Sequence, residues 1–179
     1  MSSVRAAVLE QRSAVVGRWF RQYGPAIKRY AIRRVDHERS DEVVSDVFAA
    51  VLASRSALPP EGEALPWLYA FARHKALELH ASLGRQARLS TRLQAHDQVQ
   101  QVPDTAFSVT SRAWVNEVLD QLPDEDAELL RLVVWEDLDT AAASKVLGIS
   151  PGAARVRLHR IRRRVQRQLA DSKNSWRTP

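Results

Sequence analysis

Seven arginines between positions 155 and 167 are the densest group of chemically specific side chains in the sequence. They lie in the stretch 147–169, LGISPGAARVRLHRIRRRVQRQL, which also holds one histidine and no acidic residue. An arginine can donate two hydrogen bonds to the edge of a guanine, or bind a phosphate as a fixed cation. The stretch therefore predicts contact with a polyanion. Nucleic acid, an anionic membrane and a merely solubilising helix are the alternatives.

Residues suited to catalysis or metal binding are sparse. The sequence has no cysteine, which excludes disulfides, thiolate chemistry and zinc held by sulfur. His74 and His80 fall on different sides of a helix, and His37 has no partner beyond the adjacent Glu38. We therefore expect neither an enzyme nor a metal site, and no cofactor.

Composition indicates a globular protein with a basic surface. The 179 residues are 45% hydrophobic, enough for one average domain or two small ones. The net charge is +6, which favours polyanionic partners. No apolar run is long enough to cross a membrane, and charges interrupt the N-terminal MSSVRAAVLEQRSAVV where a signal peptide would be apolar. We expect a cytoplasmic protein without membrane insertion.

Helical periodicity dominates the chain, so the predicted fold class is all-α. Residues 12–35 predict one bent helix or two helices, because Gly24 and Pro25 interrupt the pattern. Residues 41–54 predict an amphipathic helix with an acidic start. A third helix is expected to open at Pro66, in its first turn, and to close near Gly84.

Two small helical domains joined by a flexible linker explain the changes in composition along the chain. Residues 1–84 form the first predicted domain. Residues 85–111 form the linker, which is rich in polar residues and could span about 90 Å if extended. Residues 112–170 form a predicted four-helix domain, followed by a tail at 171–179. Within it, the segment 120–139 holds eight acidic residues against one basic residue, so acidic and basic faces are segregated.

The end of the second domain has the layout of a helix-turn-helix. A short helix with Ala142 and Val146 facing inward ends at Gly148, the residue best suited to a left-handed turn. Ser150 is placed to cap the next helix and Pro151 to begin it. That helix has one apolar stripe, made of Ala154, Leu158, Ile161, Val165 and Leu169. The arginines therefore face outward, which favours DNA as the polyanion.

Three segments in this order and spacing resemble the extracytoplasmic-function group of the bacterial sigma-seventy family. They are EVVSDVFAAVL (42–52), PWLYAFARHKALEL (66–79) and LDQLPDEDAELLRLVVWEDLDTAAASKVLGISPGAARVRLHRIRRRV (119–165). The resemblance covers roughly residues 12–84 and 112–170. It implies an alternative sigma factor, an RNA polymerase subunit that recognises and melts promoters.

The first segment is similar to the part of these proteins that docks on the clamp helices of the largest polymerase subunit. A serine replaces the family's usual glutamine at position 45. The resemblance also implies that the second domain contacts the flap of the second-largest subunit. The implied core-binding residues are Glu42, Val43, Ser45, Asp46, Phe48 and Val51.

The second segment is similar to the helix that melts the downstream promoter element, where aromatic side chains stack on unpaired bases. Burial in the core is the alternative for Trp67 and Phe71, which lie four residues apart. His74 stands where relatives usually have an asparagine, which leaves the base preference open. The implied contact residues are Trp67, Tyr69, Arg73, His74, Lys75, Glu78, Arg85 and Arg88.

The third segment is similar to the domain that reads the upstream promoter element. Val156 stands where a small hydroxyl residue is common, and it could touch a thymine methyl group. Arginines 162, 163, 164 and 167 are expected to bind phosphates or stay solvated. The implied contact residues are Ser150, Arg155, Val156, Arg157, His159, Arg160 and Arg163.

One alternative hypothesis stays open. The protein could be a helix-turn-helix repressor or activator that acts without being a polymerase subunit. Such proteins usually dimerise and sense a ligand, and neither a dimer helix nor a pocket-like domain is evident in the sequence. The resemblance further implies an anti-sigma factor as a partner beside core polymerase and promoter DNA.

Overall fold

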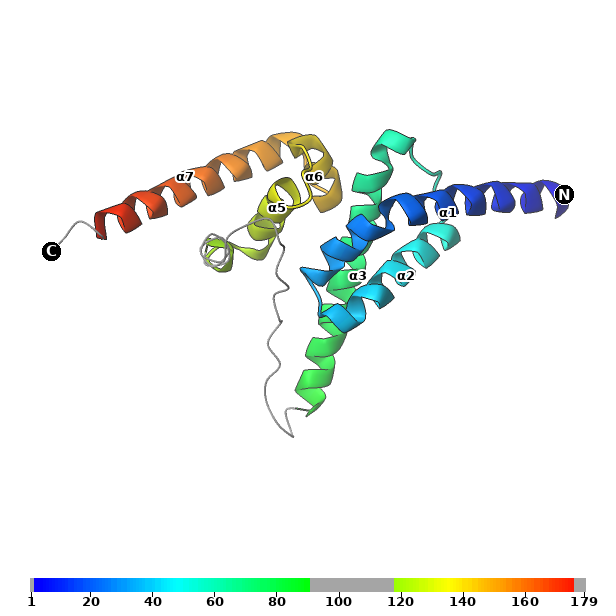
Figure 1. Ribbon diagram of the computed structural model, residues 1–179, viewed down its shortest axis with the longest axis horizontal. Coiled ribbons are helices and arrows are strands. Elements are labelled where there is room, and N and C mark those ends of the chain that lie inside the picture. Colours follow the sequence, from blue (N-terminus) through cyan, green and yellow to red (C-terminus); the bar gives the residue numbers. More distant parts are fainter. Residues whose placement is uncertain (1, 91–117, 176–179) are drawn as a thin grey trace. The chain divides into compact units, whose positions relative to one another are not determined.

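The computed structural model describes residues 2–90 and 118–175, and every regular element in these ranges is an α-helix (Figure 1). The chain divides into two compact units, residues 1–103 and 104–179. The all-α prediction with two helical domains is therefore confirmed. Most of the predicted linker, residues 91–111, lies outside the described residues.

Three helices build the first unit. Helix α1, Ser2–Ile32, is one continuous helix that passes through Pro25, which decides between the two alternatives left by the sequence. Helix α2 runs antiparallel to it, because Phe20 contacts Phe48 while Lys28 pairs with Asp41 at 2.8 Å. Pro25 removes one backbone hydrogen bond, but burial of Ile27 and Tyr30 just beyond it holds the helix together.

Helix α2, His37–Ala53, begins four residues earlier than predicted. The reason is local, because Asp36 accepts a hydrogen bond from the Arg39 backbone N–H at 2.8 Å and so caps the helix. The other end of α2 is capped across the fold. The Arg12 guanidinium donates to the carbonyl oxygens of Val51 and Ser56 at 2.6 and 2.9 Å.

Helix α3, Glu61–Ser90, is longer than predicted at both ends. It begins with the acidic first turn of Glu61 and Glu63, so Pro66 lies in the second turn and not at the start. The helix also continues through Gly84, and residues 85–90 of the predicted linker are helical. Burial of Leu68, Tyr69 and Ala72 against the other helices outweighs the unfavourable position of Pro66 inside the helix.

Aromatic rings tie the three helices together. Trp67 packs edge-on against Trp19 with ring centroids 6.2 Å apart, and Tyr69 packs against Tyr30 at 5.2 Å. Buried apolar side chains fill the space between the helices. These are Val16, Trp19, Ile27, Tyr30, Ala31, Val35, Val43, Val44, Val47, Phe48, Val51, Ala64, Leu68, Tyr69, Ala72 and Ala76.

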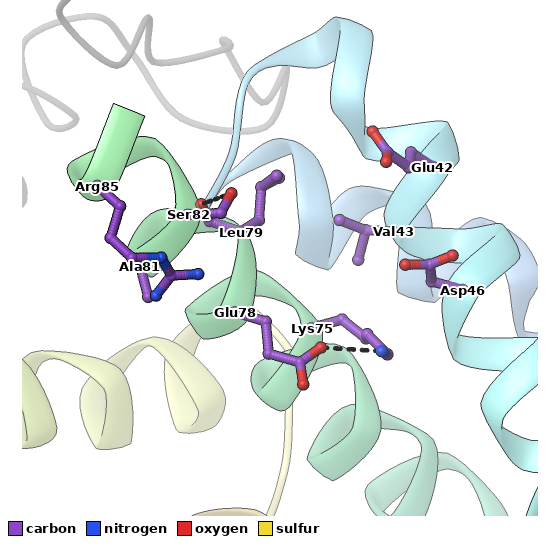
Figure 2. A pocket seen from close by; sticks show the side chains of 9 residues that line it. All are labelled: Glu42, Val43, Asp46, Lys75, Glu78, Leu79, Ala81, Ser82 and Arg85. Atoms are coloured by element: carbon purple, nitrogen blue, oxygen red, sulfur yellow. Dashed lines mark hydrogen bonds and ion pairs between the residues drawn. The ribbon is translucent and has the colours of Figure 1, made fainter. Parts of the chain in front are cut away.

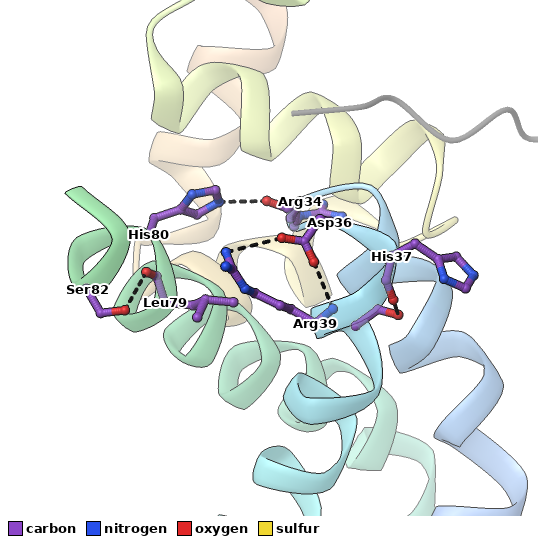
Figure 3. Close-up of polar contacts among 8 residues, drawn as sticks. Arg34, Asp36, His37, Arg39, Leu79, His80 and Ser82 are labelled. Atoms are coloured by element: carbon purple, nitrogen blue, oxygen red, sulfur yellow. Dashed lines mark hydrogen bonds and ion pairs between the residues drawn. The ribbon is translucent and has the colours of Figure 1, made fainter. Parts of the chain in front are cut away.

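The loop between α1 and α2 is fastened to α3 (Figure 3). The His80 ring donates through Nε2 to the carbonyl oxygen of Arg34 at 2.6 Å. This contact gives His80 a structural role in the first unit. Within the same loop, Asp36 forms an ion pair with Arg39 at 3.2 Å in addition to its capping bond.

The second unit contains α5 (Asp124–Val134), α6 (Thr140–Leu147) and α7 (Pro151–Ser175), and residues 118–120 are also helical. Ala143 and Val146 of α6 are buried, whereas Ala142, predicted to face inward, is only half-buried. The core residues are Val118, Leu119, Leu122, Ala127, Leu129, Leu132, Leu138, Ala143, Val146, Ala154, Leu158 and Ile161. Val165 is half-buried, and the side chain of Leu169 lies outside the described residues.

The predicted turn between α6 and α7 is confirmed. Gly148 has φ 66° and ψ 30°, and the N–H of Ile149 donates to the Ser144 carbonyl at 3.1 Å, which closes α6. Ser150 Oγ accepts from the Ala153 N–H at 3.1 Å and caps α7, with Pro151 as its first residue. Asp139 caps α6 in the same way, through the Ala142 N–H at 2.7 Å.

Replacing Gly148 by alanine should destabilise the second unit by about 1 kcal/mol. The new Cβ would meet no atom within 4 Å, so the cost comes from the left-handed backbone alone. Urea unfolding followed by circular dichroism measures it. Gly152→Ala is the matched control in helical backbone, and it should leave stability unchanged or raise it by up to about 1 kcal/mol. Equal destabilisation by both changes would contradict the backbone argument.

Candidate nucleic-acid interface

One face of α7 presents the recognition surface, defined by Arg155, Val156, His159, Arg160 and Arg163. All five side chains are exposed, and Val156 is 59% exposed. Successive helical residues turn by about 100°, so these five share one side while Ala154, Leu158 and Ile161 point to the core. Ser150 sits at the start of this face but uses its hydroxyl to cap the helix. The arrangement can read a groove of DNA from the first turns of α7.

Arg157 differs from its neighbours because it is paired within the unit. Its Nη1 lies 2.6 Å from Glu125 Oε2 and 3.9 Å from Asp126 Oδ1, both in the first turn of α5. Its side chain is only 25% exposed. No pattern along the chain predicted this pair, since 32 residues separate the partners. Arg157 therefore fastens α7 to α5 in the free protein.

A second polar surface, the α3 surface, is formed by His74, Lys75, Glu78 and Arg85, whereas Arg73 is half-buried and lies on another side of the helix, because side chains two positions apart do not share a face. Glu78 takes part in two contacts, one with Lys75 Nζ at 2.8 Å and one with His74 Nε2 at 3.1 Å. The hydrogen bond from Lys75 lowers the pKa of Glu78, and the same bond raises the pKa of Lys75. Both partners are therefore charged near neutral pH. Arg88 belongs to α3, but its side chain lies outside the described residues.

A groove of about 430 Å³ separates the α3 surface from α2 (Figure 2). Glu42 and Asp46 of α2, called here the α2 acids, line one side. Lys75, Glu78 and Arg85 line the other. Acidic and basic groups thus face each other across the groove, and Asp46 adds to the raised pKa of Lys75.

The two predicted stacking aromatics of α3 are not equally available. Tyr69 is 2% exposed and packs on Tyr30, so it belongs to the core and is excluded from the surface. Trp67 is half-buried between Trp19 and Phe71, with ring centroids 6.2 and 4.6 Å away. This placement favours the packing alternative for Trp67 and Phe71.

The predicted core-binding residues of α2 are also partly exposed and partly buried. Glu42, Ser45 and Asp46 are exposed, and the Ser45 hydroxyl donates to the Asp41 carbonyl at 2.9 Å. Val43, Phe48 and Val51 are 3%, 5% and 0% exposed, because they form the inner face of α2. Their side chains shape the helix and are left out of the proposed contact surface.

The described residues contain no group of three or more histidine and acidic side chains placed to hold a metal ion. No helix in the same part of the chain is long and apolar enough to cross a membrane.

Comparison with known proteins decides the family. Residues 112–165 match the family model of sigma-70, region 4, which spans the helix-turn-helix. The ECF RNA polymerase sigma factor SigD of Mycobacterium tuberculosis is 33% identical over 156 residues, covering 81% of this chain and 72% of SigD. This chain belongs to the extracytoplasmic-function sigma factors.

Other relatives agree with this assignment. The ECF sigma factor ShbA of Streptomyces griseus is 29% identical over 161 residues, covering 82% of this sigma factor and 83% of ShbA. The fold is similar to that of the sigma factor RpoE, solved with the anti-sigma factor NepR from Bartonella quintana. That match has a TM-score of 0.66 and 19% identity, covering 86% of this chain and 96% of RpoE. CnrH, solved with the cytosolic domain of CnrY, gives a TM-score of 0.57 at 21% identity, covering 93% and 94%.

The sigma factor therefore binds core RNA polymerase and directs it to promoters, where transcription begins. The alternative hypothesis of a repressor or activator that is not a polymerase subunit is not favoured.

Proposed function

We propose that three surfaces of this sigma factor have three separate functions. The α2 acids dock on core polymerase, the α3 surface captures the opened strand of the downstream element, and the recognition surface reads the upstream element. The exposed arginines on the face of α7 opposite its buried stripe carry this proposal. They combine base-reading chemistry with a helix held by the second unit's own core.

The recognition surface has free cations where DNA needs them. Within the described residues, Arg155, Arg160 and Arg163 have no ion-pair partner. Each arginine that binds a guanine through two hydrogen bonds discriminates by about 1 to 3 kcal/mol. Val156 offers an apolar contact for a thymine methyl group on the same face.

The α3 surface suits a single strand through its charges more than through its aromatics. Lys75 and Arg85 line the groove and can follow a phosphate backbone, and His74 is exposed next to Lys75 on the same helix. Trp67 has only part of its ring available for stacking.

The proposal extends to partners and place of action. RpoE was solved with the anti-sigma factor NepR, and CnrH with the cytosolic domain of CnrY, so an anti-sigma factor is proposed as a partner of this chain. The sigma factor would act in the cytoplasm, where polymerase and promoters meet, without catalysing a reaction itself.

Runoff transcription on a pool of genomic fragments tests the proposal. Purified core polymerase with this sigma factor should produce new transcript starts that share two upstream sequence motifs. Sequencing the transcript ends measures this directly. Transcript starts that share no motif, or a protein that fails to bind core polymerase, would contradict the proposed functions of the three surfaces.

Arg157 should contribute little to the salt dependence of DNA binding. Replacing Arg163 by alanine should lower the slope of log K against log salt by about 1, because Arg163 is exposed and expected to bind a phosphate, so that one counterion fewer is released. Arg157→Ala should change that slope much less, since Arg157 is already paired with Glu125. Fluorescence anisotropy with promoter duplex measures both slopes. Equal losses would mean that Arg157 leaves α5 to bind DNA.

A further inference from the structure

Glu78 engages two neighbouring donors of α3 with one carboxylate. Its Oε2 accepts from Lys75 Nζ at 2.8 Å, a bond drawn as a dashed line in Figure 2, and its Oε1 lies 3.1 Å from His74 Nε2. The three residues share one side of the helix, because His74 and Glu78 are one turn apart. One anion with separate oxygens for separate donors is also what a DNA phosphate would offer to this pair.

Lys75 is the more enclosed of the two donors. Its side chain is 26% exposed, compared with 72% for His74 and 51% for Glu78. Asp46 faces it from α2 across the groove, where Glu42 and Arg85 also lie. The hydrogen bond to Lys75 is the main cause of the lowered pKa of Glu78. In the free sigma factor Lys75 is thus already paired with a carboxylate.

We propose that Glu78 is an internal substitute for a DNA phosphate, holding Lys75 and His74 until a phosphate of the captured strand displaces it. The inference rests on the proposed role of the α3 surface in strand capture. It changes the role that the family resemblance implied for Glu78, from a direct DNA contact to a competitor of DNA.

The competition makes Glu78 a determinant of specificity. A carboxylate tethered one turn away is present at high effective concentration, so a lone phosphate gains little by replacing it. A strand that also supplies base contacts gains enough to displace the carboxylate. Glu78 is exposed and can turn toward solvent when it is replaced.

Removing the competitor should therefore tighten weak binding. Glu78→Gln should raise the affinity for a labelled oligothymidylate about two- to fivefold, the range expected when one exposed ion pair no longer has to break. Glu10→Gln is the matched control, because Glu10 is an exposed acid on α1 and its loss changes the net charge equally. All variants are full-length and carry Arg155→Ala, Arg160→Ala and Arg163→Ala to reduce binding by the second unit.

Lys75→Met completes a double-mutant cycle. We expect it to weaken binding alone and to remove most of the gain of Glu78→Gln. If Lys75→Met weakens binding but Glu78→Gln binds no tighter than Glu10→Gln, the substitution proposal fails while strand capture stands. If Glu78→Gln binds more weakly than the control, Glu78 contacts DNA directly. If Lys75→Met changes nothing in either background, the proposed role of the α3 surface fails.

A carbon-13 NMR titration of the Glu78 carboxyl group, with and without oligothymidylate, gives a second test. If the Glu78 ion pair were only structural, the pKa of Glu78 would not change when DNA binds. In the free protein the pKa of Glu78 should lie below its usual value of 4.5. Saturating oligothymidylate should raise this pKa, because Lys75 moves to a phosphate and negative charge approaches the carboxylate. An unchanged titration midpoint in the saturated complex would overturn the proposal.

Discussion

Replacing Arg155 and Arg160 together by alanine is expected to abolish selection of the upstream promoter element while core polymerase binding is unchanged. Both side chains are exposed on the recognition surface, away from the core of the second unit. Two lost guanine contacts at about 1 to 3 kcal/mol each correspond to roughly 30-fold to 10⁴-fold in affinity. Anisotropy with promoter and scrambled duplexes measures the selectivity, and co-purification with core polymerase measures docking.

A second pair of arginines supplies the control. Arg162 and Arg164 are exposed on the flanks of α7, outside the recognition surface, and replacing both by alanine removes the same charge. This variant should lose some non-specific affinity but keep its preference for the promoter. Loss of core binding by Arg155→Ala with Arg160→Ala would show instead that these arginines support the fold or the docking surface.

Reversing the charge of Asp46 with Asp46→Lys should weaken core polymerase binding at least about tenfold. Asp46 is exposed on α2, and a lysine there would meet the basic partner surface that the docking proposal requires. The DNA affinity of the second unit should not change, because Asp46 belongs to the first unit. Titration of labelled core polymerase with the full-length variant measures the loss.

Glu38→Lys tests whether position matters beyond charge. Glu38 is exposed in the first turn of the same helix, so this change alters the net charge equally but lies away from the groove. We expect it to retain most of the core affinity. Normal holoenzyme formation by Asp46→Lys would show that the docking surface lies elsewhere.

Local signals made much of the second unit predictable. The positive φ of Gly148, the cap at Ser150 and the first-turn Pro151 all depend on neighbours within a few residues. The same holds for the buried spacing of Ala154, Leu158 and Ile161. These features were confirmed because short-range hydrogen bonds and helical periodicity are already encoded in the sequence.

Helix ends in the first unit were harder to predict. Proline and glycine suggested a start at Pro66 and an end near Gly84, yet α3 passes through both. A breaker costs a helix a limited free energy, and contacts with other helices can exceed it. Those contacts are made by residues far away in the sequence.

The sequence by itself determined the all-α class, the helix-turn-helix and the family, because capping, periodicity and motif order are properties of neighbouring residues. Only the tertiary structure decided which residues of a motif reach the surface. It buried Val43, Phe48 and Tyr69, and it paired Arg157 with Glu125. Burial and ion pairing depend on how helices pack against one another, and a pattern along one helix does not contain that information.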